Sequence, residues 1–434
     1  MTVLTATLAD RAFAAVRPRP SGRVTELRGL QLGVRGLEAA VGDLLEVDAT
    51  PTVLAEVVAS TPQGLICLPL GSTTGLRAGA AVHAAGGPLR IRVGDALRGR
   101  VLDGLGRPVD GGPSLDALDL VTVDHPAPDA LSRPRIDTQV GLGVRALDAL
   151  TPVGRGQRVG IMAGSGVGKS SLLSMVARHT DAQISVIALV GERGREVREF
   201  IEQDLGPQGL ARSVVVVATS DAPPVERLRA AFVATRIAEW FRDTGKDVVL
   251  MMDSLTRVAM AQREIGLAAG EPPATRGYPP SVFALLPGLL ERAGTNVHGS
   301  ITGLYTVLVE GDDLQDPVGD TARSILDGHV VLSRRLATSG HYPAVDVLES
   351  VSRVAGAVTT PQQRADAQRV RQLLAAHREV RELVEIGAYV AGADADADTA
   401  LALLPQLNGF LRQPMDEADS VAATWARLHD LAAS

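Results

Sequence analysis

The 434-residue sequence contains a single cysteine, Cys67, so it has neither a disulfide framework nor a cysteine-rich metal site. It also contains no run of about 20 uninterrupted apolar residues, the length that a membrane-spanning helix requires. The first 20 residues lack the apolar core of a secretion signal. These absences predict a soluble intracellular protein whose only possible contact with a membrane is peripheral.

Aromatic residues and excess basic charge are also scarce. Aromatic side chains make up 3% of the chain, and the stretch 20–150 contains none. The formal net charge is −7 and the sequence pI is about 5.7, whereas dedicated nucleic-acid binders are strongly basic. We therefore expect no nucleic-acid partner.

Changes in composition indicate several domains, as expected for a chain of this length with 45% hydrophobic residues. Residues 1–20 form an N-terminal segment that is either a docking or membrane-surface segment or a frayed terminus. In residues 21–90, short apolar runs are separated by Gly and Pro, which predicts a β-barrel. In residues 91–357, near-continuous apolar runs alternate with helical segments, which predicts a parallel sheet covered on both faces.

Residues 358–434 are predicted to form a polar, helical C-terminal domain. One face of its first helix is marked by apolar residues at helical spacing, namely Val370, Leu373, Leu374, Val380 and Val384. The run ADADADTA at 393–400 has no apolar periodicity and predicts a linker. The fold class expected from the sequence is therefore α/β, with an N-terminal β-barrel, a central parallel sheet with flanking helices and a C-terminal helical domain.

The motif AGSGVGKS at 163–170 matches the P-loop pattern, except that Ala163 replaces the first glycine. An apolar strand-like run precedes the motif and a helix-like run follows it, as the pattern requires. Glycines allow backbone N–H groups to surround phosphate oxygens, and Lys169 reaches the terminal phosphates at a helix N-terminus. The motif predicts binding of a nucleoside triphosphate by Ala163, Gly164, Ser165, Gly166, Val167, Gly168, Lys169, Ser170 and Ser171.

Two side chains are candidates for holding Mg²⁺, the cofactor expected to accompany ATP as substrate. The Ser170 hydroxyl lies at the end of the P-loop motif. Asp253 ends the apolar run DVVLMMD, at the position where a P-loop protein needs a carboxylate. Asp253 can also cap the helix that follows, and the two roles are compatible.

The charged stretch GERGREV at 191–197 directly follows the apolar run ISVIALV. In a doubly wound sheet, ligands bind outside the carboxyl ends of the strands, and this stretch occupies such an end. Hydrolysis requires a group that polarises the attacking water. Glu192 is therefore a candidate general base and Arg193 a candidate orienting partner, whereas Arg195 and Glu196 are expected to form local ion pairs at the start of a helix.

Several long motifs occur in the same order as in one known family. They are AGSGVGKSS, GERGREV, DVVLMMDSLTR, GEPPATRGYPPSVF, EGDDLQDP, ILDGHVVLSRRLA and HYPAVDVLESVSRV. Together they resemble the flagellum-specific protein-export ATPases, which are related to the ATPases of type III secretion injectisomes and, more distantly, to the catalytic subunit of rotary ATP synthases. The resemblance covers essentially the whole chain and is strongest between residues 135 and 355.

The resemblance implies roles for residues in these motifs. Glu192 would be the carboxylate that activates water, with Arg193 near the phosphates. Asp253 would be the Walker B aspartate, and Arg257, four residues further on, would lie near the active site. The arginines of LSRRLA are interpreted as structural.

Two further roles follow from the resemblance. Tyr342 would stack on the adenine ring, and Arg353 would be an arginine finger that reaches into the active site of a neighbouring subunit. The catalytic residues expected in this way are Lys169, Glu192, Arg193, Arg257 and Arg353.

The resemblance also implies a homohexameric ring of a protein-secreting ATPase, located in the cytoplasm at the inner face of the cytoplasmic membrane. Its implied partners are a negative-regulator or stator-like protein at the N-terminus, a central-stalk protein, membrane proteins of the export gate, and export chaperones with their substrates. The acidic helical lever motif of ATP synthases is not seen in the C-terminal sequence. Torque-driven ATP synthesis is therefore disfavoured.

Three alternatives remain open at this point. The injectisome ATPase has nearly the same motifs. A hexameric RNA translocase shares the architecture but needs an RNA-binding barrel with exposed aromatic residues, which residues 20–150 do not supply. A non-catalytic ring subunit would bind nucleotide without hydrolysis, and the presence of Glu192 disfavours it.

Overall fold

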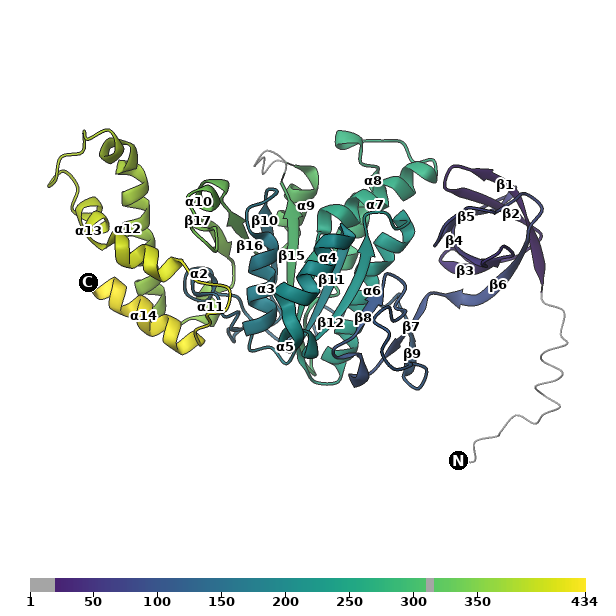
Figure 1. The fold of residues 1–434 in the computed structure, drawn as a ribbon, viewed down its shortest axis with the longest axis horizontal. Coiled ribbons are helices and arrows are strands. Elements are labelled where there is room, and N and C mark those ends of the chain that lie inside the picture. Colours follow the sequence, from purple (N-terminus) through teal and green to yellow (C-terminus); the bar gives the residue numbers. More distant parts are fainter. Residues whose placement is uncertain (1–19, 310–315) are drawn as a thin grey trace, which may run out of the picture. The chain divides into compact units, whose positions relative to one another are not determined.

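The computed structural model describes residues 20–309 and 316–434, which form two compact units (Figure 1). The first unit contains the described residues up to Leu89 together with Leu267–Gly270, and the second contains the rest. The predicted N-terminal segment lies almost entirely outside the described residues. Among the residues described, no helix combines the length and the apolar composition needed to cross a membrane.

The first unit is a closed six-stranded β-barrel with the strand order β1-β2-β5-β4-β3-β6. Its strands are β1 (Ser21–Arg28), β2 (Gln31–Arg35), β3 (Asp43–Val47), β4 (Val53–Thr61), β5 (Gly64–Pro69) and β6 (Ala81–Pro88). Side chains from all six strands fill the interior, and Leu32, Leu45 and Cys67 are completely buried. Burial raises the pKa of the Cys67 thiol to about 12, so this cysteine is a neutral packing residue.

The second unit contains a nine-stranded sheet with the main order β17-β16-β10-β15-β13-β11-β12-β8. Its strands are β8 (Val101–Asp103), β10 (Arg158–Ala163), β11 (Ile184–Glu192), β12 (Ser213–Thr219), β13 (Asp247–Asp253), β14 (Gly294–Thr295), β15 (Ser300–Leu308), β16 (Gly328–Leu332) and β17 (Val345–Ser352). The strands from β16 to β8 pair in parallel, whereas β17 pairs antiparallel with β16. Eight of the nine residues of β11 are buried, which explains its continuous apolar sequence.

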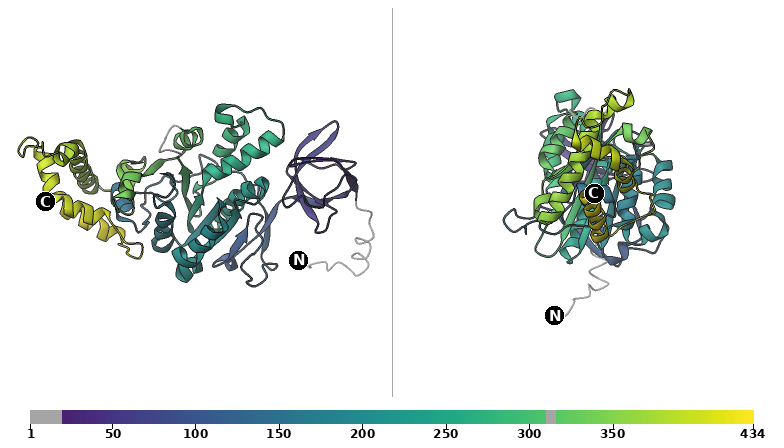
Figure 2. Two further views of the ribbon diagram at one scale, coloured as in Figure 1. Left: turned by 45° about the horizontal axis from the view of Figure 1, so that its top comes forward. Right: turned by 90° about the vertical axis from the view of Figure 1, so that its left-hand side faces the viewer.

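Helices cover the sheet on both faces (Figures 1 and 2). The helix α6 packs against β11, β12 and β13, while α3 shares a core with the other face of β10 and β11. The helices around the sheet are α2 (Arg145–Leu150), α3 (Lys169–His179), α4 (Gly194–Glu199), α5 (Gly206–Ala211), α6 (Pro224–Asp243), α7 (Leu255–Ala268), α8 (Pro280–Leu290), α9 (Pro317–Ile325) and α10 (Arg334–Thr338). A separate antiparallel pair joins β7 (Arg90–Val93) to β9 (Asp119–Thr122).

The C-terminal segment is helical, as predicted, and belongs to the second unit. Its helices are α11 (Ala355–Val358), α12 (Pro361–Glu385), α13 (Ala395–Leu411) and α14 (Val421–Ala433). Val370 and Leu373 on α12 are buried in one core with α2 and the sheet, whereas Val384 is 39% exposed. A reciprocal capping box between Thr360 and Gln363 fixes the start of α12.

The prediction of a linker at 393–400 is wrong, because α13 begins at Ala395. The Asp394 carboxylate accepts a hydrogen bond from the Ala397 backbone N–H at 2.9 Å and so caps the helix. Asp396 and Asp398 lie in the first turn, where negative charge favours the helix dipole. The alternating Asp and Ala residues are therefore a helix start.

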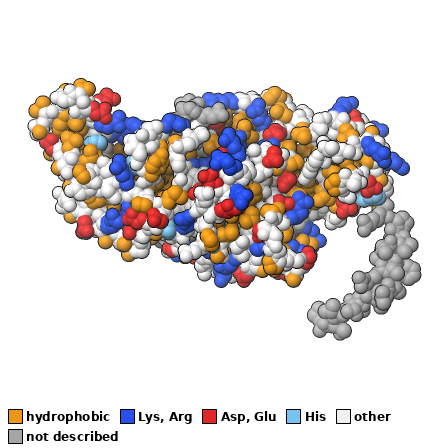
Figure 3. Space-filling model, viewed as in Figure 1, with side chains coloured by type: hydrophobic (Ala, Val, Ile, Leu, Met, Phe, Trp, Pro, Cys, Tyr) orange, Lys and Arg blue, Asp and Glu red, His pale blue; other side chains and the backbone are white. Residues whose placement is uncertain are grey.

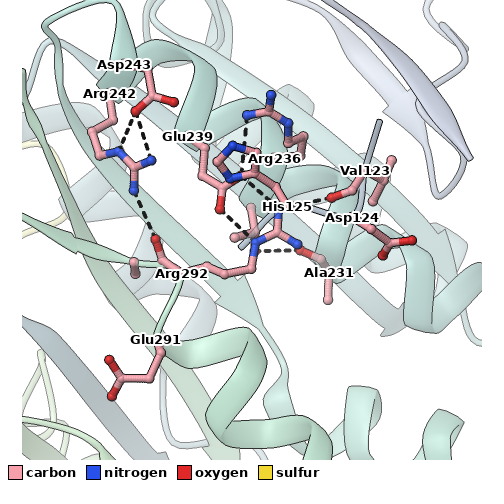
Figure 4. A network of polar contacts seen from close by, with 12 residues as sticks. Val123, Asp124, His125, Ala231, Arg236, Glu239, Arg242, Asp243, Glu291 and Arg292 are labelled. Carbon is pink, nitrogen blue, oxygen red and sulfur yellow. Dashed lines mark hydrogen bonds and ion pairs between the residues drawn. The ribbon is translucent and has the colours of Figure 1, made fainter. Parts of the chain in front are cut away.

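A buried ion-pair network joins α6 to the segment after α8 (Figure 4). Glu239 is completely buried and accepts two hydrogen bonds from the Arg292 guanidinium, at 2.7 and 2.8 Å. His125 and Arg236 approach the same carboxylate to 3.4 and 3.5 Å. Burial acts to raise the pKa of Glu239, but the contacts of Arg292 and His125 outweigh it, so the net shift is downward.

On the surface, by contrast, acidic and basic side chains are interspersed over the face seen in Figure 3.

We expect Glu239→Gln to destabilise the second unit by about 3–5 kcal/mol, because Arg292 would remain buried without its counter-charge. The lowered pKa of Glu239 means that its contribution is complete above the pKa of an unfolded glutamate and disappears as the pH falls through the folded value. Urea unfolding at several pH values measures both effects. Glu264→Gln, which alters a partly exposed pair with Arg227, is the matched control and should change the unfolding midpoint little. Equal midpoints for the two variants would contradict this account.

Candidate active site

The P-loop connects the end of β10 to the start of α3. Gly166 and Gly168 have backbone φ angles of 75° and 92°, values that residues with a Cβ rarely adopt. Val167 lies between them, and its burial in the core fixes the position of the loop. The loop therefore presents its backbone at the N-terminus of an eleven-residue helix, a geometry suited to phosphate groups.

Lys169 faces two carboxylates that come from the ends of neighbouring strands. Its Nζ lies 2.6 Å from an Asp253 oxygen and 3.4 Å from a Glu192 oxygen. The parallel pairing of β11 with β13 places Leu189 opposite Asp253, so Glu192 follows only three residues later at the same edge of the sheet. The three side chains are between 4% and 18% exposed. The structure thus brings together the predicted P-loop lysine, the Walker B aspartate and the candidate base.

The charges in this cluster alter one another's protonation. Burial raises the pKa of Glu192; Lys169 acts to lower it and Asp253 to raise it, and the net shift is upward. Burial acts to lower the pKa of Lys169, but its two carboxylate neighbours outweigh this effect, so its pKa is raised. Lys169 therefore remains charged, while Glu192 is a stronger base than an ordinary glutamate.

Ser170 and Asp253 fit the donor chemistry expected for Mg²⁺. Both provide oxygen ligands, and Mg²⁺ bound with nucleotide phosphates needs only one or two protein oxygens. Ser170 is exposed in the first turn of α3, directly after the lysine whose Nζ contacts Asp253. Ser170 and Asp253 are therefore the residues that would hold the ion.

Arg193 and Arg257 lie near Glu192 in different ways. Arg193 is the N-cap residue of α4, and its exposed side chain pairs with Glu196 at 3.3 Å. The stem of Arg257 packs so closely on Gly191 that a Cβ there would lie 3.0 Å from it. Gly191 also has a φ of 73°, so this position before Glu192 requires glycine.

The other charged residues of GERGREV form local ion pairs. Arg195 pairs with Glu199 at 2.7 Å and approaches Glu196 to 3.9 Å. This arrangement agrees with the interpretation of Arg195 and Glu196 as the solvated start of a helix.

Tyr342 lies beside the P-loop although it is distant in sequence. Its ring is so near Gly168 that a Cβ on this glycine would lie 3.3 Å from Cε1. The residue is 46% exposed, and an exposed aromatic ring is suited to stacking. The Tyr342 carbonyl accepts a hydrogen bond from the Gln413 backbone N–H at 2.9 Å, which ties it to the chain after α13.

Arg353 lies at the opposite edge of the sheet from the P-loop of its own chain. Ala163 and Val345 both pair with Leu332 at the carboxyl end of β16, whereas Ser352 pairs with Gly328 at its amino end. Arg353 directly follows Ser352, is exposed, and donates a hydrogen bond to the Arg323 carbonyl at 3.3 Å. Within one chain, Arg353 and Lys169 are therefore not brought together.

Two residues near the cluster are missing from the sequence-based predictions. The Thr306 hydroxyl donates to Asp253 at 2.8 Å, and the Arg334 guanidinium donates to the Ser165 carbonyl of the P-loop at 3.1 Å. A polar residue near the end of the buried run SITGLYTVL was a signal for Thr306. Arg334 belongs to the LSRRLA motif that the sequence analysis interpreted as structural.

This glycine-rich turn between a buried parallel strand and a helix, with its lysine facing two carboxylates, defines the class of P-loop nucleotide-binding proteins. The family model of the ATP synthase alpha/beta nucleotide-binding domain matches residues 143–352. The model of the type III secretion ATPase C-terminal domain, named after EscN, matches residues 359–430.

Similar proteins match over almost their whole length. The chain is 50% identical to a flagellum-specific ATP synthase of Bacillus subtilis, with 93% of this chain and 94% of the relative covered. It is 49% identical to a type 3 secretion system ATPase of Xanthomonas euvesicatoria, covering 98% and 97%. A structure of the assembled ATPase EscN from enteropathogenic E. coli matches with a TM-score of 0.89 and 44% identity, covering 95% of this chain and 100% of EscN. The chain belongs to the family of flagellum-specific and type III secretion ATPases.

We expect Tyr342→Ala to raise the KM for ATP about 5- to 100-fold with little change in kcat, because stacking on a base contributes about 1–3 kcal/mol. Tyr342→Phe preserves the ring and should keep the KM near the wild-type value. Steady-state ATPase kinetics measure both parameters. A normal KM for the alanine variant would exclude Tyr342 from the nucleotide site.

Proposed function

We propose that this protein hydrolyses ATP as a homohexameric ring that supports the export of flagellar proteins through a type III export apparatus. The observation that supports this proposal most directly is the contact of Lys169 with Glu192 and Asp253 at the P-loop, in a chain that aligns with flagellum-specific ATP synthases over more than nine-tenths of its length. The expected reaction converts ATP and water to ADP and phosphate.

The side chains of the cluster would divide the work of hydrolysis. The P-loop backbone and Lys169 bind and neutralise the phosphates. Glu192 is held next to them with a raised pKa and accepts the proton of the attacking water. Asp253 and Ser170 would hold Mg²⁺, which supplies electrostatic stabilisation of phosphate charge when it is bound with ATP.

Assembly into a ring would complete the active site, because it would bring Arg353 from a neighbouring subunit. Arg353 lies at the sheet edge away from its own P-loop, so it can serve as a finger only in the site of a neighbouring subunit. Arg193 follows Glu192 in sequence, and the stem of Arg257 packs on Gly191; both arginines would act near the phosphates. The assembled EscN structures, one with the central stalk EscO, support a ring with a central-stalk partner for this chain as well.

The remaining partners and the location follow from the same proposal. A stator-like regulator at the N-terminus, export-gate membrane proteins, and chaperones with their substrates would bind a ring located in the cytoplasm at the membrane. The closest competing function is that of an injectisome ATPase, since identities of 49% and 50–51% separate the two kinds of relatives only slightly. A non-catalytic subunit is disfavoured because Glu192 is present and contacts Lys169.

The ATPase rate as a function of protein concentration tests the catalytic proposal. The wild-type rate per chain should rise steeply with concentration, because the finger acts between subunits. Glu192→Gln should lower kcat about 10²–10⁴-fold, and Arg353→Ala about 10³-fold or more, at every concentration. Normal turnover by Glu192→Gln would exclude it as the base.

As the pH falls, the wild-type ATPase rate should decline at a pH above about 4.3, the pKa of a free glutamate, because the base acts only when deprotonated.

Complementation distinguishes the two export systems. We expect the gene for this chain to restore motility to a relative's strain that lacks its flagellar export ATPase, and to leave secretion unrestored in a strain that lacks its injectisome ATPase. The Glu192→Gln variant is the control for expression without catalysis. The reverse pattern would favour the injectisome function.

A further inference from the structure

A network of hydrogen bonds at the amino end of β10 holds the backbone that precedes and contains Arg353. The Asp327 carbonyl accepts two hydrogen bonds, one from the Arg353 backbone N–H at 3.0 Å and one from the Gln157 side-chain amide at 2.8 Å. The same amide lies 3.2 Å from the Ser352 hydroxyl. The Gln157 side chain therefore contacts Ser352, which precedes Arg353 in sequence. It also contacts the Asp327 carbonyl, to which the Arg353 backbone is hydrogen-bonded.

The network is closed and well satisfied. Gln157 is completely buried, and its carbonyl oxygen accepts a hydrogen bond from the Gly154 backbone N–H at 2.9 Å. The Asp327 carboxylate accepts from the backbone N–H and the guanidinium of Arg158, at 3.1 and 3.0 Å. A buried amide with both ends bonded has one favourable orientation, so it specifies the position of its partners.

The chain around Arg353 has little room to move toward β16. A Cβ on Gly328 would lie 2.4 Å from the Val351 carbonyl oxygen and 3.3 Å from the Gln157 amide nitrogen. Beyond this tightly packed end of β17, the Arg353 side chain itself is exposed and rests on the Arg323 carbonyl at 3.3 Å. A tightly packed backbone therefore carries an exposed arginine side chain.

We propose that Gln157, Asp327 and Ser352 are positioning residues for Arg353, and that they set the reach of this guanidinium into the active site of the neighbouring subunit. The inference rests on the proposed role of Arg353 as a finger. An arginine on a long, flexible side chain loses much of its effect if its backbone shifts, since a misplacement of about 1 Å can cost about 100-fold in rate. The three residues do not touch the nucleotide site of their own chain, because they lie at the other end of the strands.

Gln157→Leu and Ser352→Ala test the network, and Gln139→Leu is a matched control. The Gln157 side-chain amide bonds the Asp327 carbonyl and the Ser352 hydroxyl. The Gln139 amide instead donates to the Asp148 carbonyl and accepts from Trp425, and neither bond involves Ser352 or Arg353. We expect Gln157→Leu and Ser352→Ala to lower kcat about 10- to 100-fold and about 3- to 10-fold, with the KM for ATP unchanged. Gln139→Leu should keep kcat within about 2-fold of the wild type.

Mixed rings separate a positioning role from a general structural one. Gln157→Leu subunits have an intact site and a displaced finger, whereas Glu192→Gln subunits have the opposite defects. An equal mixture should recover about a quarter of the wild-type rate, because random assembly pairs an intact site with an intact finger at about one interface in four. A merely structural defect of the Gln157→Leu subunit would prevent this recovery.

The outcomes distinguish the inference from the function on which it rests. Normal turnover by Arg353→Ala would overturn the finger itself. If Arg353→Ala is inactive but Gln157→Leu and Ser352→Ala match the wild type, the finger stands and the positioning network is overturned. Loss of activity in Gln157→Leu without recovery in mixed rings would likewise overturn it, in favour of a defect confined to the subunit's own fold.

Discussion

The ion pair between Lys169 and Asp253 is the interaction on which the geometry of the site depends. The ammonium group is nearly buried, and a buried charge is stable only with counter-charges at hydrogen-bond distance. Asp253 and Glu192 provide them, and Thr306 fixes the aspartate from the next strand. Lys169 is therefore kept charged at the end of the P-loop, next to a carboxylate whose pKa is raised.

The direction of the parallel sheet places the candidate site and Arg353 at opposite ends of the strands. The P-loop, Glu192 and Asp253 lie at the carboxyl ends of β10, β11 and β13. Arg353 lies at the amino ends, because β17 runs antiparallel to β16 and carries the chain back. One strand, β10, connects the two edges: it begins beside Gln157 and ends at the P-loop. A subunit built in this way offers a site on one edge and an arginine on the other, which suits a closed ring.

Sequence reasoning performed well where the signal was local. The P-loop was predictable because one short segment supplies the turn, the lysine and the helix start, and Asp253 and Glu192 were predictable because each ends an apolar run. It failed at ADADADTA, where the capping of α13 by Asp394 outweighs the lack of apolar periodicity. Thr306 and Arg334 were missed because their contacts, with Asp253 and with the Ser165 carbonyl, join residues that are far apart in the chain.

The sequence alone determined the class of fold and the nucleotide motif, because hydrophobic periodicity and glycine placement are properties of short segments. The resemblance of its long motifs to one family indicated the family as well. Only the tertiary structure decided which charged residues meet. The register of β11 with β13 brings Glu192 to Lys169, and the fold brings Tyr342 to Gly168. Arg353 lies at the other end of the strands from its own P-loop, next to the network that includes Gln157 and Asp327. Contacts between residues far apart in the chain depend on strand order and direction, which no short stretch of sequence contains.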